Sequence, residues 1–306
     1  MDAKRAALTT VLVLGGFSIL VSSCSEDKDD GHGKATVIGH GDGHAASAPA
    51  HVVAPVTAQA THAAIAAAHG TVAPVHVAQH AAHWAYEGEG GPQNWATLDA
   101  KYSACSDGKN QSPIDISPVT ITSLSDIEFN YQESPLEIKN NGHTIQVNYA
   151  PGSSITVAGK QYELLQYHFH SPSEHTIGGK AYDMVAHLVH KAADGQLGVI
   201  GVVFSTGDKV NSAVSKLWLN MPEKAGVTTK VTGVKVNAAD LLPVDYTYFN
   251  YSGSLTTPPC SEGVNWMVMA TPNSVSEAQV EQFTNLFPLS ARPVQPLNGR
   301  MVRASN

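Results

Sequence analysis

The sequence predicts a mainly β protein with a single folded domain in residues 83–306. Two observations support this prediction: short runs in which apolar and polar residues alternate recur after Trp84, and stretches with helical periodicity are few. A third is a change of composition, because residues 43–83 contain no aromatic side chain that would seed a core. We therefore expect one large β-dominated domain that follows a segment of different character.

Strands are expected where the alternation is clearest, at residues 137–139, 144–149 and 154–157. Asn140-Asn141-Gly142 separates the first two runs, and this pattern is typical of a tight hairpin turn. The unbroken apolar run at 197–204 has the length of a strand and predicts one that is buried on both faces.

Two helices are expected, at residues 208–218 and 274–287. The second range contains Ser276 followed three residues later by Gln279, which is the spacing of a capping box at a helix N-terminus. The expected fold class is therefore α+β with the strands dominant.

The composition excludes several classes of protein. The 306 residues include 18 Lys and Arg against 26 Asp and Glu, a net charge of −8, whereas nucleic-acid binding requires a basic surface. Only three cysteines are present. Cysteine-rich zinc modules and disulfide-dense scaffolds are thereby excluded, because each needs about four or more.

The first residues are typical of an export signal. Two basic residues precede an apolar run over 6–21, which is too short to favour a permanent transmembrane helix. The run ends in Leu20-Val21-Ser22-Ser23-Cys24, which resembles the lipobox of bacterial lipoproteins. We expect a signal peptide over 1–23 and a lipidated Cys24; an ordinary signal peptide followed by a free cysteine is the alternative.

Lipidation of Cys24 implies an exported protein, held in the periplasm by a lipid anchor that does not span the membrane. Ser25 comes next, and the bacterial sorting pattern then favours the outer membrane.

Residues 24–82 are expected to form a low-complexity tether. No Asp, Glu, Lys or Arg occurs from 43 to 86, and nine of the 15 histidines lie between His32 and His83. We interpret these histidines as polar spacers that keep an Ala- and Val-rich chain soluble. Loose capture of Zn, Cu or Ni is the alternative, and it would make the tether the main device of a zinc store.

Three histidines of the domain are expected to share one face of a strand pair. His168 and His170 lie two residues apart in an expected strand, so their side chains point the same way. A second strand is expected over 183–190. If Gly178-Gly179 centres a tight antiparallel connection, position 170 lies opposite His187, and the three imidazoles converge.

His190 falls on the other face of its strand, so His187 is the better third ligand. Three His ligands with an open fourth position describe a catalytic zinc site rather than a structural one.

The domain resembles the α-class carbonic anhydrases, in particular their bacterial branch. The resemblance runs from residue 83 to the C-terminus and implies a large twisted, mostly antiparallel central sheet with short peripheral helices. It implies reversible hydration of carbon dioxide by a zinc-bound hydroxide, with Zn²⁺ on His168, His170 and His187. The motifs that carry it are His83-Trp84-Ala85-Tyr86, Gln111-Ser112-Pro113-Ile114-Asp115-Ile116, Asn141-Gly142-His143, His168-Phe169-His170, Ser173-Glu174-His175-Thr176, Ala186-His187-Leu188-Val189-His190, Ser254-Leu255-Thr256-Thr257-Pro258-Pro259 and Arg292-Pro293-Val294-Gln295-Pro296-Leu297.

The resemblance also implies roles around the metal. Thr256 matches the threonine that accepts the proton of the bound hydroxide, and Glu174 matches the carboxylate to which that threonine donates. Thr257 matches a residue that positions bicarbonate, and His143 matches the proton shuttle. Four residues match the apolar wall that receives carbon dioxide: Val189, Val199, Leu255 and Trp266.

Two positions depart from the family pattern, and the smaller change is Gln146, where vertebrate relatives often carry asparagine. The family usually has a glutamate two residues before its third zinc ligand, whereas this chain has Val185. Loss of such an outer partner typically costs about 10–100-fold in metal affinity or activity. Gln166, in contrast, matches the outer partner of His168.

The other two cysteines, Cys105 and Cys260, lie where bacterial relatives form a disulfide, which would persist in an oxidising compartment. The alternative is that Cys260 is a zinc ligand. A catalytically silent, binding relative is the competing function within the family, and a homodimer is expected by analogy with bacterial relatives.

Overall fold

The computed structural model describes residues 83–305. The predicted signal peptide over 1–23, the lipidated Cys24 and the predicted tether over 24–82 lie outside the described residues. The fold is therefore that of the predicted domain.

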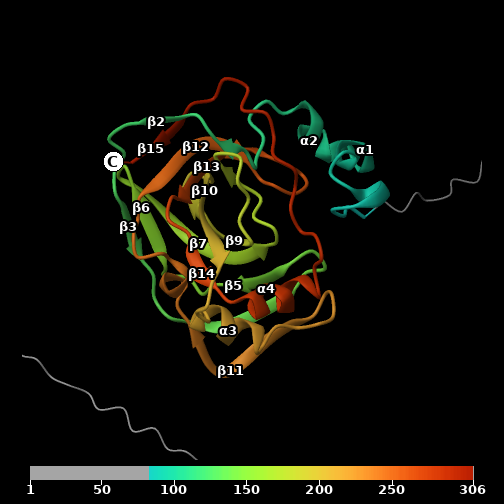
Figure 1. Ribbon diagram of the computed structural model, residues 1–306, viewed down its shortest axis with the longest axis vertical. Coiled ribbons are helices and arrows are strands. Elements are labelled where there is room, and N and C mark those ends of the chain that lie inside the picture. Colours follow the sequence, from blue (N-terminus) through green and yellow to red (C-terminus); the bar gives the residue numbers. More distant parts are fainter. Residues whose placement is uncertain (1–82, 306) are drawn as a thin grey trace, which may run out of the picture. The chain divides into compact units, whose positions relative to one another are not determined.

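A large, mostly antiparallel sheet organises the described part of the chain (Figure 1). Its main path runs β11-β4-β5-β7-β9-β10-β13-β12-β15-β2, and β3, β6 and β14 pair at its sides. The strands of the large sheet are β2 (Val119–Ile121), β3 (Ile127–Asn130), β4 (Ser134–Asn140), β5 (Ile145–Asn148), β6 (Ser154–Val157), β7 (Lys160–His170), β9 (Met184–Ala192), β10 (Leu197–Thr206), β11 (Thr228–Val236), β12 (Tyr248–Ser254), β13 (Glu262–Met269), β14 (Asn273–Val275) and β15 (Val302–Ala304).

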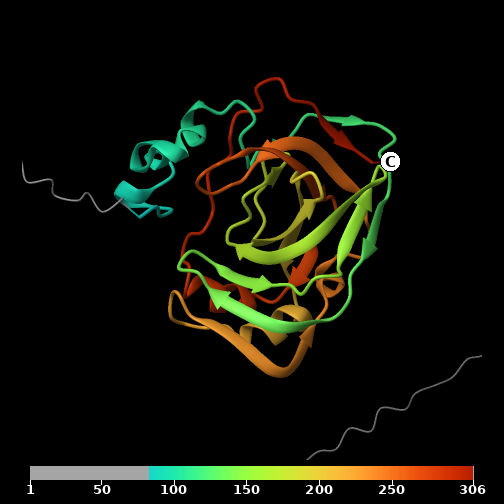
Figure 2. The ribbon, with the colours of Figure 1, turned by 180° about the vertical axis from the view of Figure 1, so that it is seen from behind.

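Most neighbouring strands run antiparallel, which confirms the predicted fold class. The parallel pairs within the large sheet are β10 with β13, β10 with β14, and β15 with β2. β1 (Asp115–Ile116) and β8 (Thr176–Ile177) form a separate small parallel pair. Seen from behind, the strands between β4 and β9 follow one another across a strongly curved surface (Figure 2).

The expected strands are present. Asn140 pairs with Ile145 where β4 turns into β5, and Gly142 has φ of +90°, a conformation that a side chain would disfavour. The hairpin predicted from Asn140-Asn141-Gly142 is therefore confirmed. β10 is buried without interruption from Gly198 to Phe204, as its unbroken apolar run predicts.

The helices are short and lie beside the sheet, with α3 and α4 near β11 and α1 and α2 together at another side (Figure 1). The Asn211 side chain caps α3, so that helix begins later than expected. α4 carries the predicted capping box of Ser276 and Gln279. None of the helices within residues 83–305 is long and apolar enough to cross a membrane. The helical elements are η1 (Gly88–Gly90), α1 (Trp95–Leu98), η2 (Ala100–Tyr102), α2 (Ala104–Asp107), α3 (Ser212–Trp218), η3 (Ala238–Leu241) and α4 (Glu277–Thr284).

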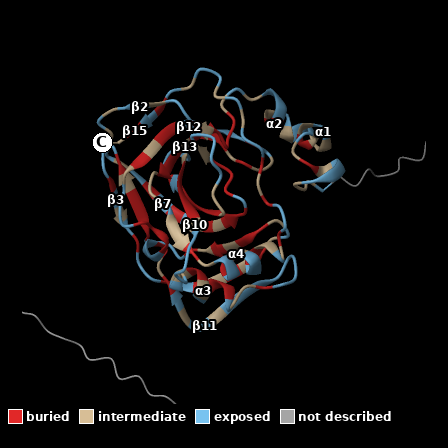
Figure 3. Ribbon diagram, viewed as in Figure 1, coloured by how far each residue is buried: buried red, intermediate tan, exposed pale blue. Residues whose placement is uncertain are grey.

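Buried residues concentrate on the central strands (Figure 3). The larger apolar cluster lies on one face of the sheet and contains Phe169, Leu188 and the α3 residue Trp218. A smaller cluster contains Val189 and Trp266. Because side chains alternate along a strand, Phe169 anchors β7 in the larger cluster while its neighbours on either side point to the opposite face.

Candidate metal centre

His168, His170 and His187 converge on the face of the sheet opposite the larger apolar cluster. Their ring centroids are 4.7–5.5 Å apart. One nitrogen from each ring lies within 4.8 Å of those from the other two, so a single metal ion fits between them. The predicted sharing of one face is therefore confirmed.

The register of the two strands differs from the prediction by two residues. His168, not His170, lies opposite His187, and His170 lies opposite Val185. The predicted pairing of 170 with 187 is wrong, but a shift of two preserves the alternation of side chains. The same three imidazoles therefore still share a face.

The physical reason lies in the connection between β7 and β9. Gly178 and Gly179 do form a two-residue turn, with φ of +59° and +79°, between Ile177 and Lys180. The segment before the turn, however, is drawn away to pair with β1. The parts of the connection before and after the turn are therefore unequal in length, and the turn does not set the register of β7 against β9.

Outer partners fix two of the three rings. Gln166 Oε1 accepts a hydrogen bond from His168 Nδ1 at 2.9 Å. The Ser290 carbonyl accepts one from His170 Nδ1 at 2.5 Å. In each case the other ring nitrogen is left to face the space between the histidines.

Glu174 lies behind the triad and is fully buried. Its Oε2 is 3.6 Å from His170 Nε2 and 3.7 Å from His187 Nδ1. Its Oε1 accepts a hydrogen bond from the Arg292 backbone N–H at 2.9 Å. Burial raises the pKa of the Glu174 carboxyl, and His170, the Arg292 backbone amide and the Thr256 hydroxyl oppose that rise. A cation held by the triad would also lower the pKa of Glu174 and so favour its ionised carboxylate.

The electrostatics of the ligands suit a metal. Burial, reinforced by the neighbouring histidines, holds the pKa of His168 and of His187 well below the usual value. Neutral imidazole is the form that binds metal. Among the described residues, the buried Nε2 of His170 and Oε2 of Glu174 have no hydrogen-bond partner, which is the pattern expected where an ion belongs.

A cavity of about 180 Å³ opens over the triad. One wall is a row of apolar side chains across three strands, because Val189 of β9 lies opposite Val199 of β10, which lies opposite Trp266 of β13. Leu255 extends this wall. The remaining lining residues are Trp84, Tyr86, Asn141, His143, Thr144, Gln146, Gln166, Thr256 and Thr257.

His143 lies at the cavity in a stack of rings. Its centroid is 3.5 Å from that of Trp84 and 4.8 Å from that of His83, and all three rings are within 23° of parallel. Burial in this stack, together with His83, lowers the pKa of His143 to about 4. The sequence assigns His83 no role in the site, and its place in the motif His83-Trp84-Ala85-Tyr86 is the signal that could have indicated one.

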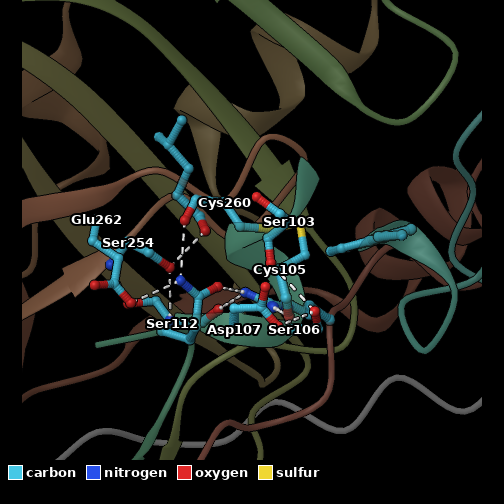
Figure 4. The surroundings of a disulfide bond; sticks show 12 residues. Ser103, Cys105, Ser106, Asp107, Ser112, Ser254, Cys260 and Glu262 are labelled. Carbon is cyan, nitrogen blue, oxygen red and sulfur yellow. Dashed lines mark hydrogen bonds between the residues drawn. A yellow bond between two sulfur atoms is a disulfide. The ribbon is translucent and has the colours of Figure 1, made fainter. Parts of the chain in front are cut away.

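Cys105 and Cys260 form the expected disulfide, with their Cα atoms 5.1 Å apart (Figure 4). The alternative role of Cys260 as a metal ligand is therefore wrong. The loop that carries Thr256 is held further by Ser112, whose backbone N–H donates to Ser254 Oγ, while Ser254 N–H donates to Ser112 Oγ (Figure 4).

Arg292 begins one of the family motifs, and the structure gives it a role in the site that the sequence did not indicate. Its guanidinium is buried and donates to the Cys105 carbonyl, to Gln111 Oε1 and to the Ser112 carbonyl at 2.8–2.9 Å. Its backbone N–H holds Glu174. One residue thus joins the disulfide-bonded segment to the carboxylate behind the triad.

A buried chain of hydrogen bonds was also not anticipated. His175 Nε2 pairs with the Tyr251 hydroxyl at 2.7 Å, and that hydroxyl pairs with Ser112 Oγ at 2.8 Å. The His175 ring also packs against Trp266. Its position directly after Glu174 was the only signal in the sequence.

We expect loss of the disulfide to destabilise the domain by about 2–4 kcal/mol, because its closed loop spans 155 residues. The variant Cys105→Ala with Cys260→Ala tests this by urea unfolding. A reductant should lower the stability of the wild type to that of the double variant and leave the variant unchanged. Equal stability of the oxidised wild type and the variant would contradict the prediction.

Comparison with known proteins gives one consistent result. The family model described as eukaryotic-type carbonic anhydrase matches residues 90–306. A carbonic anhydrase of Klebsiella pneumoniae is 47% identical over 224 residues, which cover 72% of this chain and 90% of that protein. One of Nostoc is 44% identical over 225 residues, covering 72% of this chain and 85% of that protein.

Solved structures agree with the sequence matches. A hyperthermostable carbonic anhydrase identified from an active hydrothermal vent chimney is 52% identical, with a TM-score of 0.71. The match covers 73% of this chain and all of that one. The α-carbonic anhydrase of Thermovibrio ammonificans, in complex with the inhibitor sulfanilamide, is 44% identical with a TM-score of 0.70, covering 72% and 99% of the two chains.

Proposed function

Because the chain belongs to the eukaryotic-type carbonic anhydrase family, we propose that it hydrates carbon dioxide reversibly to bicarbonate and a proton with Zn²⁺ held by His168, His170 and His187. The observation that carries the proposal is the convergence of these three imidazoles at the floor of a cavity with one apolar wall. When bound, Zn²⁺ would lower the pKa of a coordinated water to about 7, which supplies a nucleophile at neutral pH.

Glu174 would fix the direction in which the Thr256 hydroxyl donates its hydrogen bond. Thr256 is buried and lines the cavity, and its hydroxyl has a single proton to give. When that proton is donated to the Glu174 carboxylate, the Thr256 oxygen can only accept from a group in the cavity. Thr257, which also lines the cavity, is proposed to position bicarbonate.

The apolar wall would hold carbon dioxide, which is small and carries no net charge. Val189, Val199 and Trp266 are each at least nine-tenths buried, and Leu255 completes the surface. Such a wall offers a bicarbonate ion no hydrogen bonds, so the charged product would leave it readily.

His143 is proposed to carry the proton out of the cavity. An imidazole with its ordinary pKa near 6.5 suits that role. In the stack with Trp84, the pKa of about 4 keeps the His143 ring neutral at pH 7 and makes it a weak proton acceptor. We propose that the ring accepts the proton when it has turned away from Trp84 and is better hydrated. Tyr86 and Asn141, which line the same cavity, would hold the intervening water.

The chain is also proposed to be exported, lipidated on Cys24 and anchored to the outer membrane on its periplasmic side. The support is the sequence pattern of residues 1–25. A homodimer is proposed by analogy with bacterial relatives alone.

We expect residues 83–306 to hydrate carbon dioxide as fast as the mature chain, because every group of the proposed site lies within them. His187→Ala should abolish measurable hydration and the binding of one zinc ion, because it removes one of three ligands. Stopped-flow hydration with zinc quantified in the same samples measures both. A truncated domain that is inactive with one zinc bound would overturn the proposed function and favour a silent binding protein.

We expect His143→Ala to lower kcat by roughly 10²-fold in weakly buffered solution, since a positioned acid–base group typically contributes at least that much. Added imidazole buffer, which accepts the proton in place of the side chain, should restore much of the rate. Stopped-flow hydration at increasing imidazole concentration measures this. An unchanged kcat with no response to imidazole would show that the proton leaves by another group.

We expect Cys24→Ser to release the protein from membranes, because a lipid anchor at that residue requires its thiol. Fractionation of bacteria expressing the full chain measures the distribution between membrane and soluble periplasm. The matched control is Ser25→Ala, which should stay in the membrane fraction. Equal distributions of Cys24→Ser and the wild type would count against lipidation.

A further inference from the structure

The three metal-binding histidines differ in how their outer nitrogens are held. His168 Nδ1 is bonded to Gln166 Oε1, and His170 Nδ1 to the Ser290 carbonyl. His187 directs Nδ1 toward Glu174, on the side to which His170 directs Nε2, so the outer nitrogen of His187 is Nε2. This Nε2 is buried without a hydrogen-bond partner among residues 83–305. One ring of the triad is therefore not held by an outer hydrogen bond.

The cause is visible in the two strands. Gln166 lies two residues before His168 on β7, on the same face, and reaches its ring from there. Val185 lies at the equivalent position on β9, two residues before His187, and is completely buried. Its neighbours across the sheet are His170 on β7 and Val203 on β10. β9 thus has the apolar Val185 at the position where β7 has Gln166, which accepts a hydrogen bond from the ligand ring.

The other surroundings of the His187 ring offer no replacement. Trp266 packs edge-on against it with centroids 4.8 Å apart, and His175 lies at 6.0 Å in a similar orientation. His175 Nε2 is engaged by Tyr251, and its buried Nδ1 makes no hydrogen bond with His187 or any other described residue. Gly201, directly opposite on β10, has no side chain. Among residues 83–305, the ring is therefore positioned by packing and by the 3.7 Å approach of its Nδ1 to Glu174, and no hydrogen bond holds its Nε2.

We propose that His187 is the labile ligand of this site, and that the chain therefore takes up and releases its metal faster than it would with all three rings held. The inference rests on the proposed zinc function. An outer hydrogen bond fixes the ring orientation and strengthens the ligand, and its absence typically costs 10–100-fold in metal affinity or activity. Metal occupancy would then follow the surrounding zinc concentration on a shorter timescale.

The test measures the rate of zinc release from the full chain into an excess of a chromogenic chelator. Val185→Gln places the β7 acceptor at the equivalent β9 position and should slow release by about 10–100-fold. Val185→Leu, similar in size but apolar, is the matched control and should release zinc at the rate of the wild type or faster. Equal rates for Val185→Gln and Val185→Leu, with both folded and binding one zinc ion, would overturn the proposal.

A second variant keeps the test decisive if Val185→Gln does not fold. Gln166→Leu removes the outer partner of His168 and should accelerate zinc release by a similar factor. An unchanged rate would show that outer hydrogen bonds do not control release, which would also overturn the proposal. Failure of the proposed function is distinguishable, because it would appear in the wild type as absence of bound zinc or of hydration.

Discussion

The pairing of β7 with β9 in a single register is the constraint on which the site depends. It places His168 opposite His187 and sets His170 beside them on the same face. Phe169 and Leu188 alternate with these residues and are buried in the larger core on the other face. A slip by one residue would turn the imidazoles into the larger core and the apolar side chains toward the cavity, so hydrophobic packing also fixes the metal donors.

A second set of contacts closes around Glu174 and Thr256. The disulfide ties Cys260, in the loop that carries Thr256, to Cys105. The Cys105 carbonyl accepts from the Arg292 guanidinium, and the Arg292 backbone N–H donates to Glu174. Four segments that are far apart in the sequence are thus linked by one continuous set of contacts. These contacts hold both Glu174 and Thr256, and burial makes each polar contact among them costly to lose.

The cavity combines two environments that the proposed reaction needs separately. The row of Val189, Val199 and Trp266 gives a dry surface for an uncharged substrate. At the other side His143 meets the rings of Trp84 and His83, and its pKa is lowered by burial and, to a smaller extent, by the charge of His83. The same stacking that holds the ring in place makes it a weaker proton acceptor, so stacked and hydrated positions would serve different moments of the cycle.

Local features could be predicted from the sequence: the hairpin after Asn140, the capping box at Ser276, the uninterrupted burial of β10 and the shared face of His168 and His170. Each follows from spacing along one segment, because strand alternation and turn geometry are local properties. Family motifs added the disulfide, which no local pattern dictates. Val185 already marks a missing partner of His187 in the sequence, and the structure adds that no described residue replaces it. Only the folded chain shows the register of β7 against β9, the role of Arg292 and the lowered pKa of His143. These depend on which distant backbone groups pair and on how much water is excluded, and neither is set by spacing within a segment.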